Sequence, residues 1–85
     1  MWYVYTLRSI KDPKKTYIGI TENVEKRLSE HNANTQTHTK RYSPWRLETY
    51  IAFSDKTKAI SFEKYSKVGS GKAFLNKHFI DKESV

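Results

Sequence analysis

The sequence predicts an α+β domain in which a three-stranded antiparallel sheet is flanked by helices, in the order strand, strand, helix, strand, helix, helix. Three segments rich in aromatic and β-branched residues are typical of strands: residues 2–9, 16–20 and 45–53. Segments with apolar residues three or four positions apart follow the second and third of these, as in amphipathic helices. The 85 residues leave little room for a second core.

The first two strands are expected to form an antiparallel hairpin. Residues 2–9 carry apolar groups on both alternating faces, which is typical of a central strand covered on both sides. Residues 11–14 (KDPK) form a turn, since proline fixes φ and aspartate bonds the nearby backbone. Gly19 interrupts the second strand and could let the backbone come close to a ligand or to another segment.

A helix is expected over residues 22–32, directly after the hairpin. Thr21 is placed to cap it, and acidic residues in its first turn suit the positive end of the helix dipole. Val24 and Leu28 form its buried stripe. Residues 32–44 are polar and basic, have no apolar period and are therefore expected to be a loop.

The third strand, residues 45–53, is expected to alternate between two faces. Four apolar or β-branched side chains would share one of them: Leu47, Thr49, Ile51 and Phe53.

A helix over residues 56–68 should follow, capped by Ser54 or Asp55 and ended by Gly69 and Gly71, because glycine suits the left-handed C-terminal position.

A short last helix is expected at about residues 72–78, and residues 81–85 should fray. The predicted domain therefore spans residues 1–80.

The charge balance favours a polyanionic partner. Sixteen Lys and Arg residues against nine acids give a net charge of +7 and a pI near 9.7. The alternative is a soluble protein with a lysine-rich surface. The absence of cysteine excludes disulfides and thiolate metal sites and fits a reducing compartment, so we expect a cytoplasmic protein. The first residues are too few and too polar for a signal peptide or a membrane span, and no membrane partner is expected.

Four polar residues near the hairpin are candidates for chemistry. Tyr5 and Tyr17 should share one face of the sheet, although tyrosine is also common in ordinary strands. Arg27 and His31 lie four residues apart and therefore on one face of their helix, which could instead be a solvated polar face.

Glu63 is the most informative acid. It follows Ala59 and Ile60 at helical spacing, beside the packed side of its helix, where a carboxylate needs a partner. That partner could be a lysine or a buried tyrosine hydroxyl. It could equally be a divalent metal ion held by one carboxylate, water and substrate phosphate, as magnesium prefers.

Other chemistries lack a sequence pattern. The sequence has no histidine pair with zinc-ligand spacing, no Ser-His-Asp order, no phosphate-cradling glycine loop and no dinucleotide fingerprint.

The hairpin and first helix together resemble a known family. The tripeptide YVY at residues 3–5, then YIG at residues 17–19 and the following Thr21, Asn23, Arg27 and His31 closely resemble the GIY-YIG nuclease domain. PWRL at residues 44–47 and the helix containing Glu63 continue the match. The chain is similar to small stand-alone bacterial members, and to the nuclease domains of the excision-repair endonuclease and of branched-DNA endonucleases.

This resemblance implies metal-dependent cleavage of a DNA phosphodiester. Residue by residue, it assigns catalytic roles to the two motif tyrosines, the helix arginine and histidine, and the metal-binding glutamate: Tyr5, Tyr17, Arg27, His31 and Glu63. Asn76 would correspond to a late asparagine that supports the site, without a local motif to anchor it. Tyr3 replaces the first glycine of the family motif, and Ile20 stands where some repair-type members have lysine.

The implied mechanism places one Mg²⁺ or Mn²⁺ ion on Glu63 and a phosphate on Arg27. Tyr5 or Tyr17 would orient or deprotonate the water, and His31 would relay that proton or hydrogen-bond a tyrosine. Three basic residues are candidates for non-specific phosphate contacts: Lys40, Arg41 and Arg46.

The sequence thus predicts a DNA endonuclease, structure-directed or weakly sequence-specific, that acts in DNA repair or recombination. Site-specific cutting is not expected from this chain alone, since no extra DNA-recognition domain is evident. The alternative is a nucleic-acid-binding module with the nuclease fold that has little activity without a partner subunit.

Overall fold

The computed structural model describes residues 1–33 and 37–80. Its centre is an antiparallel sheet of β1 (Trp2–Ser9), β2 (Thr16–Thr21) and β3 (Trp45–Phe53), in the order β2-β1-β3. β1 is the central strand, and residues 4–9 are buried. The predicted α+β fold class is confirmed.

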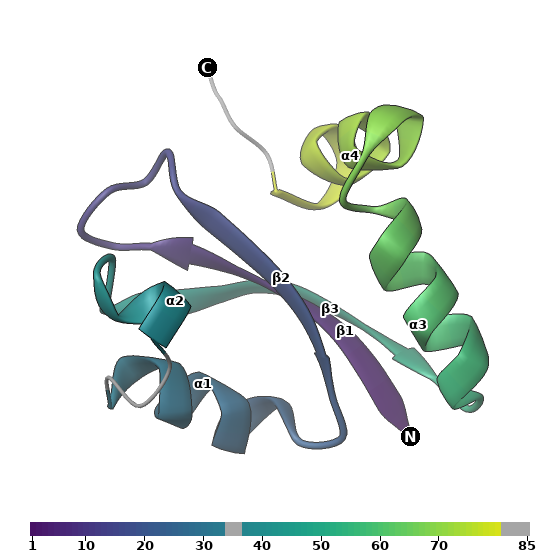
Figure 1. The fold of residues 1–85 in the computed structure, drawn as a ribbon, viewed down its shortest axis with the longest axis horizontal. Helices are drawn as coiled ribbons and strands as arrows, with labels where there is room; N and C mark the ends of the chain where they lie inside the picture. Colours follow the sequence, from purple (N-terminus) through teal and green to yellow (C-terminus); the bar gives the residue numbers. More distant parts are fainter. Residues whose placement is uncertain (34–36, 81–85) are drawn as a thin grey trace.

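Helices cover both faces of the sheet (Figure 1). α1 (Val24–Asn32) and the short α2 (Thr37–Lys40) lie on one side, and α3 (Lys56–Tyr65) and α4 (Gly69–Leu75) lie on the other. α4 continues into a π-helical turn, η1 (Asn76–Ile80). α2 corrects the expectation of a loop throughout residues 32–44, because the apolar period that would have indicated a helix is absent from those four residues.

The pairing register decides which side chains share a face. Tyr5 of β1 is opposite Gly19 of β2 and Tyr50 of β3. Tyr5 and Leu7 therefore point toward α1, where they form a core cluster with Trp45. The other face of the sheet lies against α3. Phe53 of β3, which pairs with Trp2 of β1, contacts Phe62 of α3 there, with 5.6 Å between ring centroids.

Leu47 does not share a face with the other apolar residues of β3, which corrects the expected alternation. Thr6 pairs with Thr49 but Leu7 pairs with Leu47, so the register shifts between these two β1 residues. Such a β-bulge adds one residue to one strand and turns the side chains beyond it to the other face. Leu47 accordingly packs on the cluster that faces α1.

The start of α1 also differs from the expectation. Asn23, not Thr21, is the N-cap, and its side chain accepts a hydrogen bond from the Lys26 N–H at 3.0 Å. The Thr21 hydroxyl instead accepts from the Asn23 N–H at 3.1 Å. The helix therefore begins at Val24, two residues later than expected.

α3 begins where expected but ends at Tyr65, three residues early. Asp55 caps it by accepting from the Thr57 N–H at 2.9 Å. Gly69, with φ of 56°, is the first residue of α4, and the C-cap of α3 is Ser66, so Gly69 does not end α3 as expected. Gly71 lies inside α4, not beyond a helix end, and a Cβ there would overlap the Tyr65 carbonyl.

Two expectations concern the chain as a whole. No helix in the described part of the chain is long and apolar enough to cross a membrane. The single domain over residues 1–80 stays a prediction, and the expected fraying of residues 81–85 lies outside the described residues.

Candidate active site

Tyr5 is at the centre of a hydrogen-bonded cluster between β1 and α1. Its side chain is 1% exposed, and its hydroxyl lies 3.0 Å from His31 Nε2 and 3.4 Å from Arg27 Nε. His31 Nδ1 in turn lies 2.7 Å from Thr39 Oγ1, at α2. Arg27 and His31 thus meet one tyrosine from a single helix face, and the buried His31, 1% exposed, is not part of a solvated face.

The chemistry of the donors fixes the direction of these bonds. A guanidinium can only donate, so the Tyr5 oxygen accepts from Arg27. We assign the Tyr5 O–H as donor to an unprotonated His31 Nε2, because this assignment gives the buried Tyr5 hydroxyl hydrogen an acceptor. In this tautomer His31 is neutral, and its Nδ1–H donates to the Thr39 oxygen.

The pKa values of the cluster agree with this arrangement. Burial raises the pKa of Tyr5 to about 12, although the bond from Arg27 opposes the rise. Burial, and next the positive charge of Arg27, lower the pKa of His31 below its ordinary value. The hydrogen bond to Tyr5 is the largest of the effects that raise the pKa of Arg27. At neutral pH the cluster therefore contains a neutral tyrosine, a neutral histidine and a cation.

Gly19 allows the two motif tyrosines to lie on the same stretch of sheet. A Cβ at this position would be 2.6 Å from the Tyr5 hydroxyl oxygen and 3.0 Å from Tyr17 Cε2. The ring centroids of Tyr5 and Tyr17 lie 6.2 Å apart, and that of Tyr17 lies 4.9 Å from His31. The close approach expected at Gly19 is confirmed, and the segment that approaches is β1.

Tyr17 differs from Tyr5 in that it is only half-buried and lines a groove. We call this the edge groove, because it lies where edge strand β2 meets the end of α3 and α4. It encloses about 200 Å³. Its lining is Thr16, Tyr17, Ile18, Lys67, Lys72, Leu75 and Asn76.

Arg27 is also only half-buried and extends from the cluster toward solvent. Its Nη1 donates to Glu30 at 3.0 Å, one helical turn further on. It lines a second hollow of about 430 Å³ together with Ile20 and Thr21 at the end of β2. The guanidinium, with 32% of its side chain exposed, is therefore accessible to an anion.

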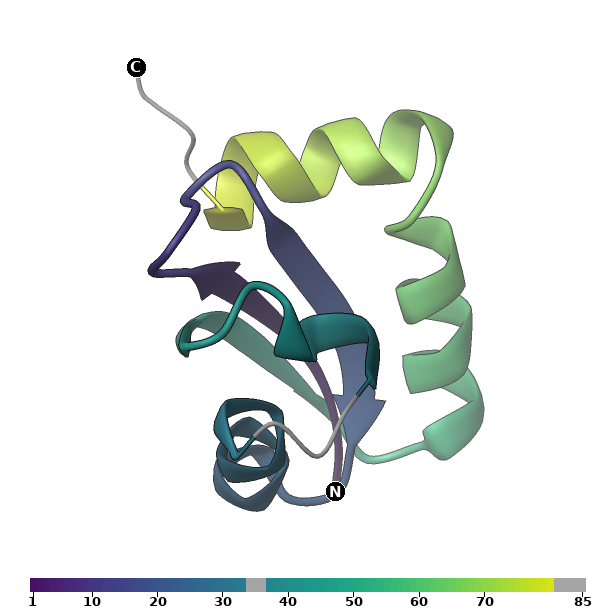
Figure 2. The ribbon, with the colours of Figure 1, turned by 60° about the vertical axis from the view of Figure 1, so that its left-hand side comes forward.

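Glu63 lies on α3, across the sheet from α1 (Figure 2). Its side chain is 16% exposed and pairs with Lys67 at 2.7 Å. Within the described residues it bonds to none of the other four predicted catalytic residues (Tyr5, Tyr17, Arg27 and His31), so the predicted set is not one contact network. Lys67 connects the two parts of the set, because the same lysine lines the edge groove beside Tyr17.

The four candidates for substrate binding lie in three different parts of the structure. Asn76 lies with Tyr17 in the edge groove. Lys40 and Arg41 are exposed at the end of α2, next to the His31 partner Thr39. Arg46 pairs with Glu48 at 2.8 Å on β3, which leaves it less available to a phosphate than the other two.

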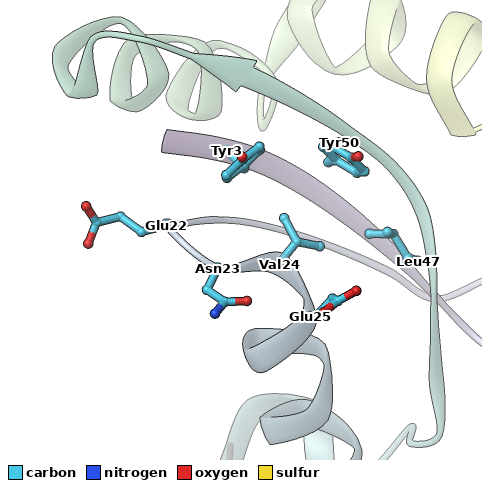
Figure 3. Close-up of a pocket in the computed structure, with 7 residues that line it drawn as sticks. All are labelled: Tyr3, Glu22, Asn23, Val24, Glu25, Leu47 and Tyr50. Atoms are coloured by element: carbon cyan, nitrogen blue, oxygen red, sulfur yellow. The ribbon is translucent and has the colours of Figure 1, made fainter. Parts of the chain in front are cut away.

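A third hollow, of about 300 Å³, lies between the start of α1 and strands β1 and β3 (Figure 3). Tyr3 and Tyr50 make an edge-to-face contact over it, with centroids 5.6 Å apart. None of the predicted site residues lines this hollow, which separates it from the candidate active site.

Residues 1–78 match the GIY-YIG catalytic domain. The chain belongs to this family. It is 38% identical over 65 residues to a structure-specific endonuclease subunit SLX1 homolog of Giardia intestinalis, covering 72% of this chain and 18% of that protein. It is 40% identical over 65 residues to the structure-specific endonuclease subunit slx1 of Talaromyces marneffei, covering 69% and 17%. The GIY-YIG chain thus spans less than a fifth of the length of these relatives.

The predicted family is confirmed over nearly the whole GIY-YIG chain. The similarity to small stand-alone bacterial members stays a prediction.

GIY-YIG domains depend in general on a divalent metal ion, so the side chains that could bind one are of interest. The described residues contain no group of three or more His, Cys, Asp or Glu that could hold a metal. A single carboxylate completed by water and phosphate is a common magnesium arrangement, and Glu63 offers that. The Glu63 carboxylate therefore fits a metal held jointly with substrate, and in this structure it pairs with Lys67.

Two residues that contact the candidate site were missed by sequence reasoning. Thr39 belongs to a segment with no period and meets His31 only through the tertiary fold, so no sequence signal indicates it. Lys67 lies four residues after Glu63, and this helical spacing could have identified it as the lysine partner.

Proposed function

We propose that this chain is a DNA endonuclease that hydrolyses phosphodiester bonds with one divalent metal ion, Mg²⁺ or Mn²⁺, in DNA repair or recombination. The observation that carries the proposal is the contrast between a buried Tyr5–His31–Arg27 cluster and a half-buried Tyr17 at an open groove. Family membership and the printed names of the relatives, structure-specific endonuclease subunits, support the same reaction class.

Tyr17 is the better candidate to orient and deprotonate the attacking water. Tyr5 has a pKa raised to about 12, so its hydroxyl keeps its proton at neutral pH and is a poor base, and it already hydrogen-bonds to His31. Tyr17 is half-buried and lines the edge groove, which supports its access to the attacking water. His31 then serves to hold Tyr5, the second of its two predicted roles, because its Nε2 is occupied.

Arg27 is proposed to bind the scissile phosphate. Its bonds to Tyr5 and Glu30 orient the guanidinium, and a planar fork of donors suits two phosphate oxygens. The charge that it supplies matters most as negative charge develops on the phosphate in the transition state.

Glu63 is proposed to hold the metal ion. The ion, when bound, would neutralise phosphate charge and activate water as a Lewis acid. The partly buried Glu63 carboxylate supports this role, and Lys67 would have to move aside. Asn76 is proposed to support the substrate from the edge groove.

The net charge, the names of the relatives and the cysteine content support proposals for the substrate, the partner and the location. The net charge of +7 suits DNA, and the exposed Lys40 and Arg41 are candidates for contacts with the backbone, while Arg46 is a weaker one. The relatives are named structure-specific endonuclease subunits, which supports a structured nucleic acid as substrate and a protein partner. A cytoplasmic location is proposed from the absence of cysteine.

Cleavage assays separate the enzyme from a binding module of the same fold. The chain should be incubated with plasmid, single-stranded and branched DNA, with and without Mg²⁺ or Mn²⁺. Metal-dependent cutting that is lost in Glu63→Ala and kept in Glu25→Ala, an exposed residue of α1, is the expected result. Binding without any metal-dependent cut would favour the binding module, and full cutting by Glu63→Ala would contradict the metal role of Glu63.

A further inference from the structure

The edge groove has an electrostatic character that the proposed reaction does not explain. Its lining includes two lysines, Lys67 and Lys72, and no carboxylate. Three neutral groups that can donate hydrogen bonds complete the polar part: Thr16, Tyr17 and Asn76. Such a lining suits an anion.

The two lysines come from neighbouring elements that converge on β2. Lys67 lies in the turn between α3 and α4, and Lys72 lies in α4. Both are exposed, and 49% of the Lys67 side chain is accessible. The lysines therefore present two ammonium groups to solvent beside the half-buried Tyr17.

We infer that the edge groove is a phosphate subsite in which Lys67 and Lys72 bind the DNA backbone next to the scissile phosphate. This inference rests on the proposed function, since it uses Tyr17 as a mark of where the reacting phosphate lies. The chain of a nucleic acid would then pass along the edge strand β2, with the reacting phosphate near Arg27 and its neighbour between the two lysines.

The ion pair between Lys67 and Glu63 couples the phosphate subsite to the Glu63 carboxylate. Lys67 Nζ lies 2.7 Å from a Glu63 carboxylate oxygen, so in this state part of its charge is used within the protein. Replacement of the Glu63 carboxylate by a neutral amide would leave this ammonium available to the groove. Such a substitution should therefore raise the affinity of the groove for phosphate.

DNA binding measured in EDTA tests the subsite without any dependence on cleavage. The affinity for a fluorescently labelled duplex should be followed by anisotropy at several salt concentrations, with circular dichroism as the folding control. Lys67→Gln and Lys72→Gln should each weaken binding several-fold and lower the salt slope by about one. Lys58→Gln, which removes an equal charge from exposed α3 surface, should change both quantities less.

A double-mutant cycle tests the coupling to Glu63. Glu63→Gln should tighten DNA binding in EDTA, and the gain should vanish in the Lys67→Gln background. A gain that persists without Lys67 is a general charge effect and contradicts the release of this lysine.

The possible failures are distinguishable. If the wild-type chain binds no DNA, the proposed function fails. If it binds DNA but Lys67→Gln, Lys72→Gln and Lys58→Gln have equal affinities, only the phosphate subsite is contradicted.

Discussion

Tyr5 and Tyr17 lie on paired strands with ring centroids 6.2 Å apart, yet their surroundings differ. Tyr5 is buried, and its hydroxyl is held by Arg27 and His31. Tyr17 is half-buried and lines the edge groove. This difference is the basis for proposing separate tasks for the two motif tyrosines: Tyr5 fixes the geometry of the site and Tyr17 contacts substrate.

The cause of the difference is the position of each strand. β1 is central and covered by α1, so Tyr5 loses water and needs internal partners. β2 is an edge strand, and the groove along it keeps Tyr17 accessible.

Tyr17→Phe should have the largest effect on catalysis. It removes the proposed base and should reduce the cleavage rate about 10²- to 10⁴-fold, the usual range for a general base. Thermal unfolding should change little, because Tyr17 is only half-buried and Phe keeps its ring contacts with Tyr5 and His31. Tyr50→Phe, at an exposed tyrosine outside both regions, is the matched control. Cleavage by Tyr17→Phe near the wild-type rate would contradict the assignment.

Gly19→Ala should destabilise the inner cluster by about 1–3 kcal/mol, the usual cost of overpacking. The added Cβ would lie 2.6 Å from the Tyr5 hydroxyl oxygen, so the ring must move. Denaturant unfolding measures the cost. Gly69→Ala is the control, since its Cβ meets no atom within 4 Å and any cost there reflects only the positive φ. Cleavage should fall in Gly19→Ala and stay unchanged in Gly69→Ala.

Tyr5→Phe should lower the stability of the domain more than Tyr17→Phe does, and the cleavage rate less. It leaves an Arg27 donor and a buried His31 acceptor without their shared partner, at a cost of about 1–3 kcal/mol in the free energy of unfolding. Cleavage should fall less than in Tyr17→Phe. Equal stability of Tyr5→Phe and wild type would show that the cluster does not hold the site together.

His31 makes stability depend on pH. Because its pKa is lowered in the folded state, the unfolded chain binds the proton more readily below about pH 6.5. The free energy of unfolding should therefore fall as the pH decreases from there, by at most about 1.4 kcal/mol per pH unit, and gain nothing from this group at higher pH. His31→Gln should flatten this acid slope, and exposed His78→Gln should not.

The sequence predicted the strands closely because alternation and aromatic content are local signals. β3 was predicted with its observed bounds, and the hairpin placed Tyr5 and Tyr17 on one face. The spacing of Arg27 and His31 predicted that both would face the same way, and both do meet Tyr5.

Features set by tertiary pairing were not predictable from sequence. The bulge that turns Leu47 depends on how β3 pairs with β1, which β3 alone does not encode. The contact of Thr39 with His31 depends on where α2 packs. The sequence restricted the partner of Glu63 to a few groups but did not decide among them, because a lysine and a metal ion can both pair with the same carboxylate.

The central claim is that Tyr5 stays protonated while Tyr17 serves the reaction. Nuclear magnetic resonance of ¹³Cζ-labelled tyrosine, with the Tyr5 signal assigned by Tyr5→Phe, measures the protonation state of Tyr5 directly. With a pKa raised to about 12, the Tyr5 signal should keep its protonated shift throughout the neutral and mildly alkaline range in which the domain stays folded. Ionisation of Tyr5 at or below its ordinary pKa of about 10 would contradict the account.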